Sequence, residues 1–371
     1  MRVVLWRYRC SYSGAVSTPP KLRPDLDQLP GYRAGARAAG AVSLASNENS
    51  AGLLPGLAEI IATAAKDVHR YPDPAANRLL QRLSEHLHVH PDQIALGTGS
   101  VAICQQITAA TCSPGDEVVY AWRSFEAYPI VTRLAHARSV QVPLLPDSRH
   151  DLPAMAAAIT DRTRVVFVCT PNNPTGPAIP TAELAEFLDQ VPPEVLVVVD
   201  EAYYEYAAAS GEQFGGSLSL LDQHPKAMVL RTFSKAYGLA GLRVGYGVAD
   251  PSVVQGLRKA ATPFGVNHLA QEVAAAALEL SADMEQQVAA TVVERERVLA
   301  AVRAQGWPVP DTQGNFYWLP LGADTEAVAE ACKQAGVLVR AFPGEGVRVT
   351  IGDQEPNETV LDVLSSYSPT N

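Results

Sequence analysis

The middle of the chain alternates wholly apolar runs with helical segments, and this pattern restricts the fold more than any other feature. The runs "RVVFVCT" (164–170) and "EVLVVVD" (194–200) are apolar at consecutive positions rather than at every second one. Such strands are typical of a sheet that is buried on both faces. Between them, "TAELAEFLDQ" (181–190) has helical periodicity, and Thr181 is predicted to cap the helix. The alternation predicts an α/β fold with a mostly parallel sheet flanked by helices.

The same pattern extends through most of the chain. Further strands are predicted at 93–96, 116–121, 139–145, 226–234 and 243–249. After about residue 265 the pattern changes, with helices predicted at 268–305 and 325–335 and strands at 314–321, 337–342 and 346–352. We therefore expect a large α/β domain at 45–265, a smaller α+β domain made from 21–44 and 266–371, and a flexible N-terminal extension at 1–20.

Composition limits the classes of function. The 371 residues are 47% hydrophobic and 18% charged, which is typical of a soluble globular protein. A formal net charge of -10 argues against nucleic acid as a partner, and no apolar run reaches the roughly 18 residues that would span a membrane. The five cysteines form no C-x-x-C pair and the histidines no metal motif. We expect a cytoplasmic protein with reduced thiols and no metal site.

Polar residues stand where three of the predicted strands end. Asn172 and Asn173 follow one strand, Asp200 closes the next, and Ser234 and Lys235 close a third. In open parallel sheets, ligands bind beyond the carboxyl ends of the strands. We therefore expect these side chains to share one site.

Together with the turn "GTGS" (97–100), this set of groups matches the needs of one cofactor. A glycine-rich turn that opens a helix presents backbone N–H groups to an anion such as phosphate. A buried Asp200 needs a positive partner, and a lysine among apolar groups and other cations can act as an amine nucleophile, as Lys235 would. Taken singly, each group has a plain structural alternative: a tight turn, an ion pair or a solvated lysine. Together they fit pyridoxal phosphate, which offers a phosphate, a ring nitrogen and an aldehyde.

A series of motifs makes the chain recognisable. In order along residues 22–365 they are "SNEN", "RYPD", "GTGS", "PGDEVV", "TPNNPTG", "DEAYYEY", "RTFSKAYGLAGLRVGY" and "VRVTIG". With these motifs the chain resembles fold type I pyridoxal-phosphate aminotransferases of the histidinol-phosphate aminotransferase family. The segments "AWRSFEAYP" and "GEGVRVTIG" are most similar to the actinobacterial aromatic (phenylalanine) aminotransferase branch.

The resemblance implies roles toward the cofactor. Lys235 would bind the cofactor aldehyde and carry a proton between the substrate Cα and C4′, while Asp200 would pair with the pyridinium nitrogen. Tyr203 and Asn173 would bind the ring oxygen. The phosphate would be held by Gly99, the backbone amides of Ser100 and Val101, Thr232, Ser234 and Arg243, and Phe125 would stack on the pyridine ring.

The resemblance also implies roles toward substrate and partner. Arg348 would bind the substrate α-carboxylate through both guanidinium nitrogens, with Asn47 as a second candidate for that group. Tyr32 and Arg340 match positions that face the substrate side chain or its phosphate. Tyr71 would reach the cofactor phosphate of a neighbouring subunit, which implies a homodimer with shared active sites.

Substrate identity is the least determined part of the prediction. Relatives commonly carry Gly-Pro-x-Pro where this chain reads "SNENSAGLLPG" (46–56), and Trp122, Trp318 and Phe316 fit either an aromatic pocket or the core. We expect transfer of an amino group between an amino acid, favoured to be aromatic, and a 2-oxo acid, favoured to be 2-oxoglutarate. Histidinol phosphate as donor, or a dedicated step of a specialised biosynthetic pathway, remain alternatives.

Two readings outside this enzyme class also remain. The chain could be a cofactor-free scaffold, although the set of lysine, aspartate, amide and arginine positions is intact. It could also be a nucleotide-binding protein, but "GTGSVA" (97–102) completes neither a G-x-x-x-x-G-K-[ST] loop nor G-x-G-x-x-G.

Overall fold

The computed structural model describes residues 20–24, 26, 29 and 40–367. Contacts divide the chain into two units, Met1–Gly31 and Tyr32–Asn371. In the first unit the amide of Leu26 donates to the carbonyl of Arg23, which forms a tight turn. The sheets and helices that build the candidate site all belong to the second unit.

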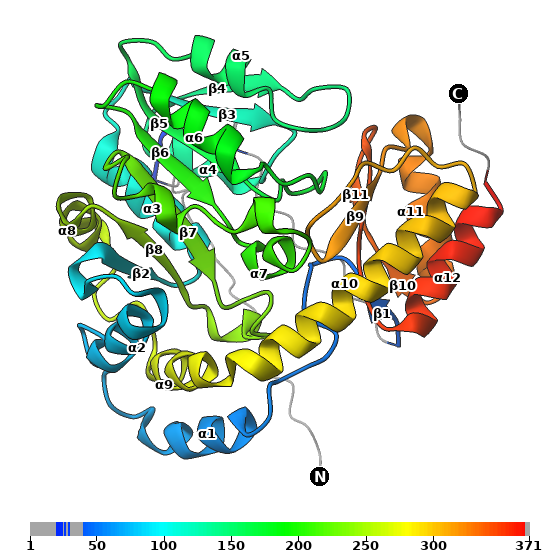
Figure 1. The fold of residues 1–371 in the computed structure, drawn as a ribbon, viewed down its shortest axis with the longest axis horizontal. Helices are drawn as coiled ribbons and strands as arrows, with labels where there is room; N and C mark the ends of the chain where they lie inside the picture. The colour runs from blue at the N-terminus through cyan, green and yellow to red at the C-terminus, as the bar shows by residue number, and fades with distance from the viewer. Residues whose placement is uncertain (1–19, 25, 27–28, 30–39, 368–371) are drawn as a thin grey trace, which may run out of the picture. The chain divides into compact units, whose positions relative to one another are not determined.

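A seven-stranded sheet organises the second unit, with helices on both of its faces (Figure 1). The strands lie in the order β2-β8-β7-β6-β5-β3-β4. Strands β7, β6, β5, β3 and β4 pair in parallel, whereas β8 runs antiparallel to both of its neighbours. Their bounds are β2 (Ile94–Gly97), β3 (Glu117–Trp122), β4 (Arg138–Pro143), β5 (Thr163–Cys169), β6 (Leu196–Asp200), β7 (Ala227–Thr232) and β8 (Gly245–Ala249). The predicted α/β fold with a mostly parallel sheet is confirmed.

Each face of the sheet packs into its own hydrophobic core. Successive residues of β5 alternate between the two, with Val166 and Val168 in one core and Val165 and Phe167 in the other. This explains why the central strands are apolar at consecutive positions. The first core also contains residues of α1 (Leu57–Ala64), α2 (Asn77–Leu87), α5 (Leu152–Ala157), α6 (Thr181–Gln190), α7 (Tyr204–Ala208) and α9 (His268–Ala277), and the second those of α3 (Ser100–Thr111), α4 (Ala127–Leu134) and α8 (Pro251–Ala260).

One predicted helix cap and the predicted continuity of one helix are wrong. Pro180, not Thr181, occupies the cap position of α6, because the Pro180 carbonyl already accepts the first helical hydrogen bond, from the amide of Leu184. The predicted helix at 268–305 is interrupted by a short 3-10 turn, η7 (Leu278–Leu280), and continues as α10 (Ser281–Ala304). Leu280 leaves the helical conformation, with φ -104° and ψ 29°.

The C-terminal third builds a third hydrophobic core, separate from the two that flank the large sheet, around a small antiparallel sheet of order β11-β12-β9. It contains β9 (Phe316–Leu319), β11 (Arg340–Phe342) and β12 (Gly346–Thr350), covered by α10, α11 (Thr325–Gln334) and α12 (Gln354–Ser365). The run predicted as one strand at 337–342 is split, because β10 (Val337–Leu338) pairs in parallel with β1 (Val42–Ser43) and β11 pairs with β12. The β1–β10 pairing positions the segment that follows β1, and this segment contacts β12 where the Thr350 amide donates to the carbonyl of Leu44.

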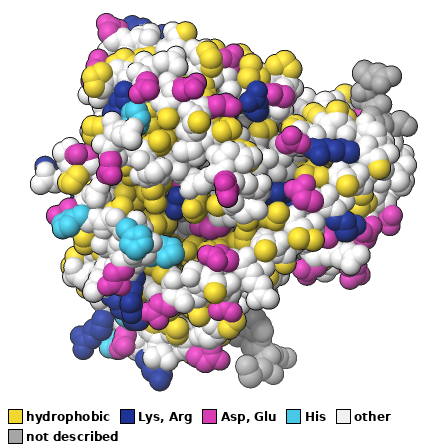
Figure 2. Space-filling view, viewed as in Figure 1, with side chains coloured by type: hydrophobic (Ala, Val, Ile, Leu, Met, Phe, Trp, Pro, Cys, Tyr) yellow, Lys and Arg dark blue, Asp and Glu magenta, His cyan; other side chains and the backbone are white. Residues whose placement is uncertain are grey.

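The surface carries charged side chains of both signs, and the described cysteines are free thiols. Figure 2 shows acidic and basic side chains interspersed over the face in view. Across the described ranges, no helix is long and apolar enough to cross a membrane. Cys104, Cys112, Cys169 and Cys332 are free thiols, and Cys10 lies outside the described residues.

Candidate active site

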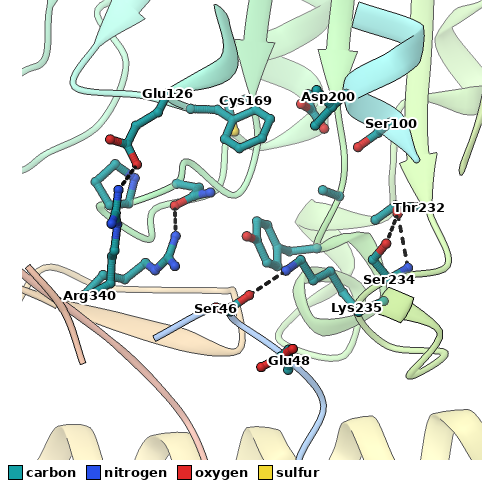
Figure 3. A pocket seen from close by; sticks show the side chains of 18 of the residues that line it. Ser46, Glu48, Ser100, Glu126, Cys169, Asp200, Thr232, Ser234, Lys235 and Arg340 are labelled. Atoms are coloured by element: carbon teal, nitrogen blue, oxygen red, sulfur yellow. Dashed lines mark hydrogen bonds and ion pairs between the residues drawn. The ribbon is translucent and has the colours of Figure 1, made fainter. Parts of the chain in front are cut away.

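A cavity of about 240 Å³ opens at the carboxyl ends of the parallel strands (Figure 3). Its wall comes from the strand ends, from the segment after β1 that includes Ser46 and Glu48, and from the β11–β12 hairpin. Twelve of the predicted site residues line it: Ser100, Val101, Phe125, Asn173, Asp200, Tyr203, Thr232, Ser234, Lys235, Arg243, Arg340 and Arg348. Residues far apart in the sequence are thus brought to one place.

Lys235 projects into the cavity from the loop that follows β7 (Figure 3). Its Nζ donates to the carbonyl oxygens of Ser46 and Asn47, each at 3.0 Å. Burial, followed by the nearby positive charge of Arg348, lowers the pKa of Lys235 to about 7, although Glu48 opposes the shift. A large fraction of the side chain is therefore a neutral amine near pH 7, the form that attacks a carbonyl or takes a proton.

Asp200 ends β6 and is only 2% exposed. The Tyr128 hydroxyl donates to its Oδ2 at 2.9 Å, but Oδ1 has no hydrogen-bond partner among the described residues. Burial raises the pKa of Asp200 to about 6. A buried carboxylate with an unused oxygen requires a positive or donating partner, and a ring N–H of a bound cofactor would provide it.

An anion cradle forms where α3 begins. Gly99 precedes the helix with φ 80°, a conformation that favours glycine, and a Cβ there would overlap the guanidinium of Arg243. Arg243 also lies close to the Ser234 hydroxyl, at 3.4 Å, and Ser234 contacts the Thr232 hydroxyl at 3.0 Å. The helix N-terminus, one guanidinium and two hydroxyls together suit a phosphate.

Arg348 reaches the cavity from β12 and is 8% exposed. Its Nη1 donates to Asn173 Oδ1 at 2.5 Å and its Nη2 to the carbonyl of Ala45 at 2.7 Å. Asn47 lies beside the cavity wall, where its Nδ2 donates to the Tyr203 hydroxyl at 2.9 Å. Burial raises the pKa of Tyr203, so its hydroxyl stays protonated at neutral pH.

Several predicted residues do not line this cavity. Tyr71 is 83% exposed and packs its ring against Phe264, with 4.8 Å between the ring centroids. Tyr32 lies outside the described residues. The aromatics considered for a pocket are buried or partly buried elsewhere: Phe316, Trp318 and Trp122.

Three contributors were not predicted from the sequence. Tyr128 donates to Asp200, Glu126 forms an ion pair with Arg340, and the carbonyl of Ser46 accepts from the catalytic-site lysine. Tyr128 follows Phe125 by one helical turn, which is a weak signal that both face one site. Nothing in the local sequence around Glu126 or Ser46 points to their partners.

The residues present fit pyridoxal phosphate. Among the described residues, one buried carboxylate oxygen of Asp200 has no hydrogen-bond partner. Gly99 and Arg243 form a cradle that a side chain at position 99 would fill, and Lys235 places an amine in the same cavity. The cofactor has a basic ring nitrogen, a phosphate and an aldehyde, and each has a counterpart here.

Known proteins resemble this chain over almost its whole length. The profile of the family described as "Aminotransferase class I and II" matches residues 39–364. An aromatic amino acid aminotransferase of Thermobifida fusca (strain YX) is 53% identical over 357 residues, which is 95% of this chain and 99% of that protein. Another from Streptomyces avermitilis is 53% identical over 354 residues, 94% of this chain and 98% of that protein.

A solved structure has the same fold. The crystal structure of histidinol-phosphate aminotransferase from Sinorhizobium meliloti in complex with pyridoxal-5'-phosphate superposes with a TM-score of 0.85 at 26% identity, covering 95% of this chain and 98% of that one. The predicted fold type I architecture and the predicted enzyme class are thereby confirmed. This chain belongs to the class I and II aminotransferase family.

Proposed function

We propose that this aminotransferase binds pyridoxal phosphate, takes an aromatic amino acid as amino donor and uses 2-oxoglutarate as acceptor. The observation that carries the proposal is the meeting of Lys235, Asp200 and Arg348 in one cavity. The two relatives with 53% identity support the donor class, because both are named aromatic amino acid aminotransferases. Phe125 and Phe342 in the cavity wall offer apolar contact to an aromatic side chain.

The cofactor would be held at three places. Asp200 would accept a hydrogen bond from the ring nitrogen through its unused Oδ1, and Tyr203 and Asn173 would bind the ring oxygen. Ser234 and Arg243, with the start of α3, would hold the phosphate. Once bound, pyridoxal phosphate supplies an aldehyde that reacts with amines and a ring that accepts negative charge from the adjacent carbon.

The protein's own groups then bind the substrate and move its proton. The Arg348 guanidinium would exchange its contact with Asn173 or Ala45 for the substrate α-carboxylate. Lys235, whose pKa is about 7, would take the proton from the substrate Cα and return it as a general acid. Because every amino acid and 2-oxo acid carries an α-carboxylate, both half-reactions can use the same residues.

Histidinol phosphate is a second candidate donor. Arg340 lines the cavity and could bind a phosphate, and the Sinorhizobium meliloti structure is a histidinol-phosphate aminotransferase. Against it, Arg340 already forms an ion pair with Glu126, with 2.8 Å between Nη2 and Oε2. A phosphate dianion that took the place of this carboxylate would bring one more negative charge than the Arg340 guanidinium can neutralise.

A half-reaction screen tests the proposal. The protein loaded with pyridoxal phosphate is mixed with one amino donor at a time, and the loss of visible cofactor absorbance is followed. We expect phenylalanine and tyrosine to convert the protein at least about tenfold faster than histidinol phosphate does. Faster conversion by histidinol phosphate would contradict the aromatic substrate, and a protein that stays colourless with saturating cofactor would contradict the cofactor.

We also propose a cytoplasmic homodimer with shared active sites. Tyr71 supports the dimer, because it lies outside the cavity of its own chain and is exposed to contact with another. In the resembled family, the matching tyrosine reaches the cofactor phosphate of the neighbouring subunit. The buried free thiols of Cys104, Cys169 and Cys332 support a reducing compartment.

A further inference from the structure

Two ion pairs join the loop after β3 to the β11–β12 hairpin beside the cavity. Glu126 binds Arg340, with 2.8 Å between Oε2 and Nη2, and Arg123 binds Glu345, with 2.8 Å between Nε and Oε2. Only the first pair lines the cavity. Figure 3 shows Glu126 and Arg340 on the opposite side of the view from Ser100, Thr232 and Ser234.

The position of this pair relates it to the substrate side chain. In the proposed function, Arg348 binds the substrate α-carboxylate and Lys235 acts at the substrate Cα. A substrate held in this way would direct its side chain away from Thr232 and Ser234, toward the wall that contains Arg340 and Phe342. The Arg340 guanidinium lies 5.2 Å from the centroid of the Phe342 ring, so the same wall offers apolar and cationic contacts.

Glu126 neutralises this wall. The side chain of Arg340 is 13% exposed, so its charge would be costly without a partner, whereas the Glu126 side chain is 32% exposed. Glu126 can therefore turn toward water at low cost, while Arg340 stays in the cavity. A substrate carboxylate that replaced Glu126 would make the same kind of charge-assisted hydrogen bond, so the exchange is close to balanced.

We propose that Glu126 sets the charge that the cavity presents to the substrate side chain. It masks Arg340 when that side chain is apolar and releases Arg340 to a side-chain carboxylate. This inference rests on the proposed function, because only an enzyme that binds an aromatic amino acid and a dicarboxylic 2-oxo acid in turn needs both states. Glu126 acts through Arg340 and is a specificity-determining residue, not a catalytic one.

Binding of two inert acids tests the inference. Glutarate has a side-chain carboxylate, 3-phenylpropanoate has an aromatic ring, and neither carries an amino group to transfer. Their dissociation constants are measured by spectral titration of the holoenzyme. We expect Glu126→Gln to bind glutarate about tenfold more tightly, because Arg340 loses its competing carboxylate, and to bind 3-phenylpropanoate within about twofold of the original chain. Arg340→Gln should weaken glutarate about tenfold and spare 3-phenylpropanoate.

Glu345→Gln is the matched control, because it breaks the neighbouring ion pair with Arg123 outside the cavity. We expect it to leave the ratio of the two dissociation constants unchanged. An unchanged ratio in Glu126→Gln, or the same change in both variants, would overturn the inference and leave the two pairs as a structural bridge. The proposed function is judged separately by the donor screen: preference for histidinol phosphate would refute it, and the glutarate ratio would still decide the role of Glu126.

Discussion

Asp200 is predicted to lower the stability of the cofactor-free protein at neutral pH. Burial raises its pKa to about 6, above its ordinary value, and the hydrogen bond from the Tyr128 hydroxyl opposes this shift only in part. Between about pH 4 and pH 6 the folded, cofactor-free protein thus holds a proton that the unfolded chain has released. Stability from this group is present below that window and is lost as the pH rises through it.

Replacement of Asp200 by asparagine should therefore stabilise the cofactor-free protein at pH 7 while weakening its hold on the cofactor. We expect a gain of about 1–3 kcal/mol in the free energy of unfolding at pH 7 and almost none at pH 4, measured by urea denaturation. Asp362→Asn on the exposed side of α12 is the control and should change neither value. An equal gain at both pH values would contradict the assigned cause.

The protonation of Lys235 predicts a second pH dependence, that of the rate of cofactor uptake. Its amine reacts only when neutral, and its pKa is about 7. The rate at which the cofactor-free protein takes up pyridoxal phosphate should rise about tenfold between pH 6 and pH 8 and then level off. Stopped-flow absorbance measures this rate, and Lys235→Ala should show no uptake of this kind. A flat profile over that range would mean that the amine is not the titrating group.

At the level of elements, the cradle at the start of α3 depends on a backbone conformation. Gly99 adopts φ 80° and leaves room for the Arg243 guanidinium. Gly115 also has a positive φ, 93°, but a Cβ there would meet nothing within 4 Å. Substitution at Gly115 therefore introduces backbone strain alone, whereas substitution at Gly99 introduces backbone strain and also fills the cradle.

Gly99→Ala should weaken the affinity for pyridoxal phosphate at least about tenfold, because the new methyl group displaces Arg243 from the phosphate site. Gly115→Ala should cost about 1 kcal/mol of stability and leave that affinity unchanged. Equilibrium titration of cofactor fluorescence or absorbance gives both dissociation constants. Equal affinities in the two variants would show that the cradle does not hold the phosphate.

The sequence predicts those parts of the site that depend on local structure. Asp200 and Lys235 stand at the ends of apolar strands, so strand position alone places them at one edge of the sheet. Glu201, one residue after Asp200, points to the other face and pairs with Arg231 at 2.8 Å, as strand alternation requires. Contacts between distant segments carry no local signal: 214 residues separate Glu126 from Arg340.

The predictions of where strands and helices are interrupted are wrong for a similar reason. The run at 337–342 ("VLVRAF") is apolar except at Arg340, but its two halves pair with different strands, β1 and β12. The interruption of the helix at Leu278–Leu280 has no glycine or proline to announce it. In both places, tertiary packing overrides a continuous local pattern.

For the whole molecule, the proposed homodimer predicts a coupling between assembly and cofactor affinity. At micromolar concentrations the protein should sediment with twice the mass of one chain. Tyr71→Phe should leave this mass unchanged and weaken the affinity for pyridoxal phosphate about tenfold, because one hydroxyl contact across the subunit boundary is lost. Tyr367→Phe, whose hydroxyl donates to the carbonyl of Ala327 within its own chain, is the control. A monomeric protein, or a dimer in which Tyr71→Phe binds the cofactor normally, would contradict the shared site.

The reversed direction of β8 has a consequence for the order in which the molecule assembles. Because β7 and β8 are antiparallel neighbours, the chain returns through the loop 233–244 without a crossover helix, and Ser234 and Arg243 meet within nine residues of each other. Arg348 meets the carbonyl of Ala45 across 303 residues. Contacts that are close in sequence form with little loss of chain entropy, whereas distant ones must wait for the ends of the chain to dock. We therefore expect a refolding chain to form the Ser234–Arg243 side of the phosphate cradle before Arg348 reaches the carbonyl of Ala45.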